Sequence, residues 1–181
     1  MVAGRPGADM TVRKRAIPLD SMIGQYLPDA DFGDAYAVSV PSSNQSPEDS
    51  FHAIMSSMPD WFRRLFKLRN KLVRPFGLVA PRSSEVDRMM PKQGYQPGDR
   101  IGVFEFYGRT GNEVITGADD KHLDFRLSVL RIPGPGVDEV IVSTLVKRHN
   151  FAGRAYLRSI LPFHELGIRS LLRNAAETAK L

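Results

Sequence analysis

Cysteine is absent from the 181 residues of the chain, and tryptophan occurs once. Without cysteine, the protein can form no disulfide bridge, no thiolate zinc site and no cysteine nucleophile. A domain of this length buries about 70% of the surface that its unfolded chain exposes, so it needs no such covalent or metal support. We therefore expect a domain held together by its own apolar core, with no bound metal and no cofactor.

Long apolar runs are absent as well. No stretch approaches the ~18 uninterrupted apolar residues of a membrane-spanning helix. Residues 1–22 include basic side chains but lack the apolar segment of a signal peptide. Both absences favour a soluble, cytoplasmic protein. Residues 1–15 mix glycine, proline and charge without a period, which is typical of a disordered N-terminal segment, and we expect a single domain over residues 16–181.

Acidic residues are missing between Trp61 and Phe76. This segment contains six basic residues, which are Arg63, Arg64, Lys67, Arg69, Lys71 and Arg74. The whole chain has 25 basic and 20 acidic residues, so removing these six leaves 19 against 20, and the net charge of +5 is local. The aromatic residues share the apolar stripe of this helix and do not alternate with the cations, so nucleic acid is not an expected partner. The cations are either the wet side of a core helix or a contact for an anionic membrane surface or an acidic partner.

The spacing of apolar residues predicts an α+β fold. Residues 34–40 alternate as a strand, and two short helices are expected from residues 46 and 59 onward, with a long connection over residues 75–100. Four strand-like runs separated by turns then predict an antiparallel meander, over residues 101–107, 113–117, 122–131 and 139–149. A helical pattern covers about 152–179. One packing buries every apolar face: a helix-grip (START-like) fold, in which a curved antiparallel sheet wraps around the long C-terminal helix.

Three local motifs carry a resemblance to a known family. They are Asp119–Arg126 (DDKHLDFR), His149–Tyr156 (HNFAGRAY) and Pro162–His164 (PFH). Over roughly residues 20–176 the chain resembles an uncharacterised bacterial domain-of-unknown-function family, whose members occur alone or fused behind a short-chain dehydrogenase-like domain. The resemblance implies the helix-grip architecture of START-like and polyketide-cyclase-like (SRPBCC) proteins, and a possible dehydrogenase-like partner. The chain has no glycine-rich dinucleotide fingerprint of its own, so it looks like the free-standing form.

Two residues are candidates for proton transfer. His164 lies on the apolar stripe of the C-terminal helix and should point toward the sheet, where an imidazole that titrates near neutral pH can act as general acid or base. The plainer interpretation is a core histidine bonded to a carbonyl or carboxylate. Glu105 would be a general acid with a raised pKa if its side of the strand is buried, and an ordinary solvated residue if not. Catalysis would require a partner near His164, such as Glu105 or Asp124.

The remaining candidates are ligand contacts. The apolar walls of a pocket between sheet and helix would come from Phe104 or Tyr107, and from Phe125, Leu127 and Leu161. Two cations are candidate anchors for a ligand anion, Arg126 on the polar side of its strand and Arg154 at the start of the last helix. For each of them the alternative is a structural ion pair. The polar residues of the first motif, Asp119, Asp120, His122 and Asp124, lack the spacing of a metal site and are more typical of a turn.

Three functions follow from these candidates. The leading hypothesis is a binding protein for a small apolar or amphipathic molecule, held between the sheet and the C-terminal helix. The second is an enzyme of cyclase, dehydratase or isomerase type that uses His164. The third is an interaction protein that places the basic helix 61–76 on an anionic membrane surface or an acidic partner.

Overall fold

The computed structural model describes residues 10–73, 94–101, 104–178, 180 and 181. In this part of the chain the strands form one antiparallel sheet in the order β1-β2-β7-β6-β5-β4-β3. The strands are β1 (Arg13–Arg15), β2 (Phe32–Pro41), β3 (Arg100–Ile101), β4 (Phe104–Arg109), β5 (Glu113–Asp119), β6 (Leu123–Ile132) and β7 (Val137–Arg148). The helices are α1 (Ile23–Tyr26), α2 (Pro47–Ser56), α3 (Asp60–Val73) and α5 (Phe151–Glu177).

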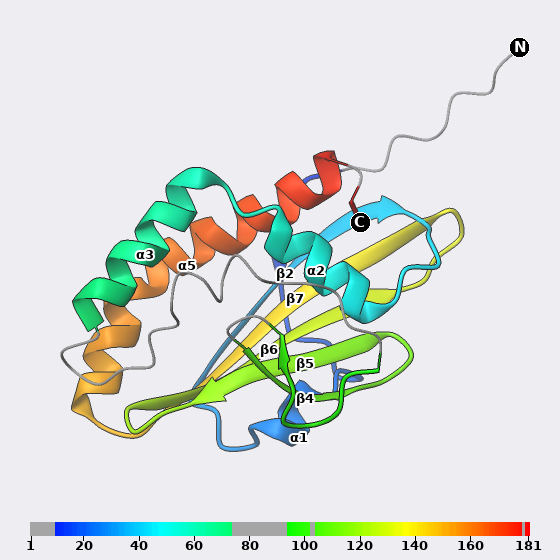
Figure 1. The fold of residues 1–181 in the computed structure, drawn as a ribbon. Helices are drawn as coiled ribbons and strands as arrows, with labels where there is room; N and C mark the ends of the chain where they lie inside the picture. The colour runs from blue at the N-terminus through cyan, green and yellow to red at the C-terminus, as the bar shows by residue number, and fades with distance from the viewer. Residues whose placement is uncertain (1–9, 74–93, 102–103, 179) are drawn as a thin grey trace, which may run out of the picture.

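The two faces of the sheet are covered differently (Figure 1). The helices α2, α3 and α5 lie on one side, which we call the inner face, and the short α1 lies on the other, the outer face. The sheet is curved and α5 runs along its inner face, so the predicted helix-grip architecture is confirmed. The order of the elements along the chain also agrees with the prediction, because α2 and α3 follow the long strand β2 and the meander follows them.

Alternation along the strands explains which residues form the core. Tyr36, Val38 and Val40 of β2 project to the inner face and pack with the apolar sides of α2 and α5. The intervening residues Ala35 and Ala37 belong to a smaller cluster on the outer face. Because successive side chains of a strand point to opposite faces, one strand contributes to both layers.

Helix caps define where α2 and α5 begin. The hydroxyl of Ser46 accepts a hydrogen bond from the backbone amide of Asp49, and Pro47 occupies the first helical position, as the sequence predicted. The side chain of Asn150 accepts the corresponding bond from the amide of Gly153. Residues 102, 103 and 74–93 lie outside the described part, so most of the predicted connection over 75–100 is not assessed.

Two elements near the N-terminus were not predicted. The sequence predicts disorder for residues 13–15, but they form β1 and pair with residues 35–37 of β2. The segment that begins α1 is bonded to the buried carboxylate of Glu113 on β5, which accepts hydrogen bonds from the Ser21 hydroxyl and, at 2.8 Å, from the Met22 amide. The same carboxylate accepts a hydrogen bond from the Ser128 hydroxyl. A strand of three residues and a single helical turn are too short to show a period.

Candidate functional site

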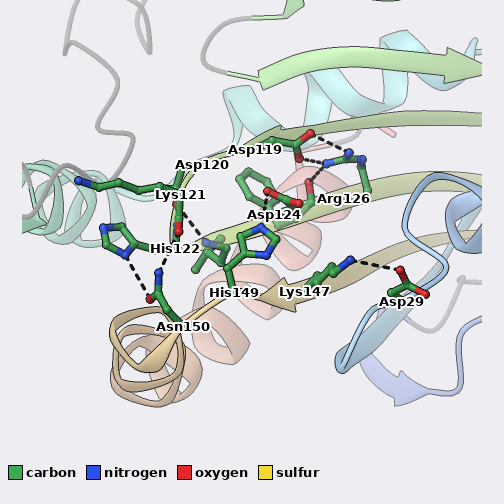
Figure 2. Close-up of polar contacts among 12 residues, drawn as sticks. Asp29, Asp119, Asp120, Lys121, His122, Asp124, Arg126, Lys147, His149 and Asn150 are labelled. Atoms are coloured by element: carbon green, nitrogen blue, oxygen red, sulfur yellow. Dashed lines mark hydrogen bonds and ion pairs between the residues drawn. The ribbon is translucent and has the colours of Figure 1, made fainter.

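The first motif closes the turn between β5 and β6 (Figure 2). One carboxylate oxygen of Asp120 accepts hydrogen bonds from the amides of His122 and Leu123, at 2.7 and 3.0 Å. Asp120 therefore forms the turn, in agreement with the turn predicted for this motif.

The second motif joins that turn to the start of α5. The Asn150 side-chain oxygen lies 3.2 Å from Nδ1 of His122, and its amide nitrogen donates to the carbonyl of Lys121 at 2.9 Å. Gly153 is required here, because a Cβ at this position would lie 2.1 Å from the carbonyl oxygen of His122. The two motifs therefore act as one structural lock between a hairpin and the long helix.

Arg126 lies buried on the outer face, where its terminal nitrogens are bonded to neighbouring groups while its Nε makes no hydrogen bond with the described residues. Its guanidinium donates to both carboxylate oxygens of Asp119 and stacks on the ring of Tyr107, 3.7 Å from its centroid. The Tyr107 hydroxyl also donates to Asp119, at 3.1 Å. Burial raises the pKa of Tyr107 to about 12, with the Arg126 charge opposing the shift and the Asp119 charge adding to it. Burial acts against ionisation of Asp119, but hydrogen bonds and charge from Arg126 outweigh it and lower its pKa.

The outer face therefore holds several of the predicted site residues, away from the space between sheet and helix. Glu105 is exposed on this face: its cross-strand partner is Gly117, which in turn pairs with Arg126 on the next strand. Oδ1 of Asp124 lies 2.9 Å from Nε2 of His149. Arg126 has its own carboxylate partner, which leaves little of its hydrogen-bonding capacity for a ligand anion. Arg154 is exposed on the first turn of α5.

His164 points to the inner face, and its partner is a residue that the sequence reasoning missed. Its Nε2 lies 3.3 Å from Oδ1 of Asp34, whose side chain is 6% exposed, against 21% for the imidazole. The other oxygen of Asp34 accepts a hydrogen bond from the Tyr36 hydroxyl at 3.2 Å. Burial raises the pKa of Tyr36, and the negative charges of Asp34 and Glu165 raise it further. Glu105 and Asp124, the partners that catalysis was expected to use, are on the opposite face.

A row of inner-face side chains continues from Asp34 across the sheet. Asp34 pairs with Thr144 on β7, and Thr144 pairs with Leu127 on β6. Thr144 is 6% exposed, and its hydroxyl makes no hydrogen bond within the described part of the chain; the oxygen is not among the fully enclosed atoms without a partner, so it reaches solvent. We call the group Asp34, His164 and Thr144 the Asp34–His164 site. Because Nε2 of His164 faces the carboxylate, Nδ1 is the ring atom left to exchange a proton with a bound molecule.

Apolar side chains surround this site. Leu161 on α5 and Phe125 on β6 are both half-buried and pack against the same small cluster. The ring of Phe125 meets that of Phe104 on β4 edge to face, with centroids 6.0 Å apart. The predicted wall residues Phe104, Phe125, Leu127 and Leu161 thus lie on the inner side, whereas Tyr107 lies on the outer face.

A second ionisable pair on the inner face, Arg131 and Asp138, leaves almost none of its hydrogen-bonding capacity unused. Arg131 donates to Asp138 at 2.7 Å, to Gln45 at 2.9 Å and to Ser50 at 3.4 Å, underneath α2. Asp138 also accepts hydrogen bonds from the hydroxyl of Ser42 and from the amides of Ser43 and Gly134. Burial would raise the pKa of Asp138, but these hydrogen bonds outweigh it and lower the pKa.

A surface hollow of about 470 Å³ lies elsewhere, at the β1 edge of the sheet. Its lining comes from β1 and the turn after it, together with Glu139, and comprises Arg13, Arg15, Ala16, Ile17, Pro18, Leu19 and Glu139. Arg13 and Arg15 both bind the carboxylate of Glu139. This hollow does not adjoin His164, so it is not the pocket that the sequence predicted between sheet and helix.

The fold and the site together define a helix-grip α+β protein with a histidine–carboxylate pair between its sheet and its long helix. Residues 26–171 match the model of a family described as protein of unknown function (DUF2867), and the chain belongs to this family. The predicted membership of a domain-of-unknown-function family is thereby confirmed. Neither the curated proteins nor the solved structures that were searched gave a match.

None of the described helices combines the length and the apolar character that crossing a bilayer requires.

Proposed function

We propose that the protein binds a small apolar or amphipathic molecule between the inner face of the sheet and α5, with the Asp34–His164 site as its polar anchor. The observation that carries the proposal is an ionisable pair within apolar surroundings that keeps hydrogen-bonding capacity. A ligand that covers a polar group without bonding it costs about 1–3 kcal/mol, so a molecule bound here should carry a polar group of its own. The Thr144 hydroxyl and Nδ1 of His164 are the groups that a ligand would satisfy.

The surroundings of the anchor favour a mostly apolar ligand. Phe125 and Phe104 keep part of their ring surface accessible, and Leu127 and Leu161 flank the anchor. Contact with such side chains would contribute roughly 25 cal/mol for each Å² of apolar surface removed from water. The anchor would then fix the orientation of the ligand.

The charge of the anchor favours an uncharged ligand. Asp34 is acidic and its histidine partner is at most singly positive, so the pair is neutral or negative. A ligand carboxylate would therefore gain little at this place and would face the buried charge of Asp34. We infer an uncharged molecule with one hydroxyl or carbonyl group.

A fluorescent probe tests the apolar part of this proposal. Titration of the protein with 1-aminoanthracene, an uncharged aromatic amine, should give saturable emission enhancement. Phe125→Ala should weaken binding about fivefold or more, because a phenyl ring leaves the wall. Phe163→Ala is the matched control, since the ring of Phe163 is exposed on α5. Equal binding by both variants, or no saturation in the wild type, would refute the proposed location.

A second comparison tests the polar anchor. The wild-type protein should bind 1-naphthol more tightly than naphthalene, which lacks only the hydroxyl group. Thr144→Val keeps the shape of the side chain and removes its hydroxyl, so it should shrink that preference. A preference that stays the same in Thr144→Val would exclude Thr144 from the anchor.

A further inference from the structure

Large apolar side chains are exposed along two neighbouring helices. On α3, Trp61 is 45% and Leu68 is 52% exposed, and on α5, Phe163 is 48% and Leu166 is 55% exposed. Among the described residues these four make up most of the exposed large apolar side chains, the others being Met10, Leu19 and Phe151. We call the group Trp61, Leu68, Phe163 and Leu166 the apolar seam.

The contact between the helices places these side chains together. A Cβ at Gly167 of α5 would lie 2.3 Å from the ring of Phe62, so the α3 ring rests directly on the α5 backbone. Trp61 is beside Phe62 in sequence and in space, with ring centroids 5.4 Å apart, and Leu166 is beside Gly167. Trp61 and Leu68 are seven positions apart in the sequence, and Phe163 and Leu166 are three positions apart, so each pair lies on one side of its helix.

The direction of the helices decides which sides meet. In Figure 1, α3 runs beside α5 in the opposite direction, and α3 lies on the side of α5 that is away from the strands. With Phe62 on Gly167 as the contact, the flank of α3 that carries Trp61 and the flank of α5 that carries Leu166 face the same side of the helix pair. The seam is therefore one ridge-like surface directed away from the sheet.

Positive charge surrounds this surface. Arg64 and Lys67 are exposed on α3, in the segment between Trp61 and Phe76 that contains no acidic residue, and Arg158 and Arg173 are exposed on α5. The acidic groups on these elements are Asp60 at the start of α3, Glu165, which pairs with Arg169 at 3.0 Å, and Glu177 near the end of α5. The cations around the seam therefore outnumber its acids.

We propose that this surface binds an anionic membrane peripherally, with the apolar seam in the headgroup layer and Arg64 and Lys67 against lipid phosphates and carboxylates. Amphipathic helices with aromatic residues on one face and cations beside them bind at the membrane interface, and tryptophan favours the headgroup region. Charge complementarity selects an anionic surface, because each lysine or arginine near such a surface adds to binding. Protruding side chains on a ridge suit a deformable interface better than a preformed groove would. The proposal is independent of the Asp34–His164 site.

The chain contains its own reporter for this test, because Trp61 is its single tryptophan. Vesicles of phosphatidylcholine with about 30% phosphatidylserine should shift the tryptophan emission to shorter wavelength and should sediment with the protein. Vesicles of phosphatidylcholine alone should do neither. Salt should reverse most of the binding, because it screens the charges.

Two pairs of substitutions separate the contributions. Arg64→Gln with Lys67→Gln should lower partitioning onto the anionic vesicles by at least about tenfold. Leu68→Ser with Leu166→Ser should lower it by a similar factor. Two matched controls should leave binding unchanged. The first is Arg100→Gln with Lys121→Gln, which removes two exposed cations of the sheet. The second is Leu19→Ser, which replaces a fully exposed leucine near the β1 edge of the sheet.

Three results would overturn the proposal. No emission shift and no sedimentation with anionic vesicles would exclude the membrane. Equal binding to uncharged vesicles would exclude the role of the cations. An emission shift that grows with protein concentration in the absence of lipid would assign the apolar seam to contact between two copies of the chain.

Discussion

Two pairs of ionisable side chains on the inner face of the sheet differ in how completely they are bonded. Under α2, Asp138 and Arg131 are enclosed by hydroxyl, amide and carboxamide groups that use nearly all of their hydrogen-bonding capacity. Under α5, Asp34 and His164 have each other and Tyr36, and the adjacent Thr144 hydroxyl has no partner within the described residues. A pair whose hydrogen bonds are all made within the protein only stabilises the fold, whereas a pair with unused hydrogen-bonding capacity can also bind a ligand. Burial alone therefore does not identify the functional pair.

The largest expected effect comes from breaking the enclosed pair. Asp138→Ala should lower the free energy of unfolding by about 3–5 kcal/mol, because the guanidinium of Arg131 would remain buried without its charge partner. Urea unfolding followed by circular dichroism measures the loss. The matched substitution Asp34→Ala should cost clearly less, since the imidazole of His164 can be uncharged and is partly accessible to water. Equal losses would remove the distinction between the two pairs.

Acid should weaken the enclosed pair as well. The folded state lowers the pKa of Asp138, so the unfolded chain binds the proton more readily. The stabilisation is therefore complete above the unfolded pKa, about 3.9, and is lost as the pH falls through the still lower folded value. Urea midpoints measured between about pH 5 and pH 2 should fall less steeply for Asp138→Asn than for the wild type. Parallel curves would show that Asp138 does not drive the acid response.

A third prediction concerns His52, which lies on α2 with its Nε2 3.2 Å from the Tyr95 hydroxyl. Burial lowers the pKa of His52, against the opposing charges of Asp49 and Glu48. The unfolded chain therefore takes up a proton first, and the stability of the fold should decline as the pH falls below about 6.5, the ordinary histidine value. His52→Gln should remove this part of the decline in urea midpoints measured from about pH 7 to pH 5. An unchanged slope would assign the decline to another group.

The same contrast explains what the sequence could and could not predict. The alternation of Tyr36, Val38 and Val40 predicted β2, and the apolar stripe of α5 predicted that His164 faces the sheet. The pairing of His164 with Asp34 spans 130 residues, and no local period encodes such a contact. Asp34 does have a signal, because it is in phase with Tyr36 and its side chain must therefore share the inner face.

The strand β4 shows a different limit. Both of its sides carry apolar residues, so alternation could not say whether Phe104 or Tyr107 faces the helices. The structure places Phe104 inside and Tyr107 with Glu105 outside, and the register shifts between Phe106 and Gly108. The family resemblance predicted from the three motifs is confirmed by the family match, and in the structure the first two motifs form a structural lock. Their polar residues are bonded to one another, and catalysis by His164 stays a prediction.

The smallest expected effect is the most direct comparison of a bonded with an unbonded hydroxyl. Ser128→Ala removes a buried hydroxyl that donates to Glu113, so it should lower the free energy of unfolding by about 1–3 kcal/mol. Thr144→Val removes a hydroxyl that has no partner among the described residues and is not fully enclosed, and it keeps the shape of the side chain, so it should change stability by less than about 1 kcal/mol. Urea unfolding of both variants in ligand-free protein measures the difference. A loss in Thr144→Val as large as that in Ser128→Ala would mean that the Thr144 hydroxyl already has a partner, and the open position proposed for a ligand would be taken.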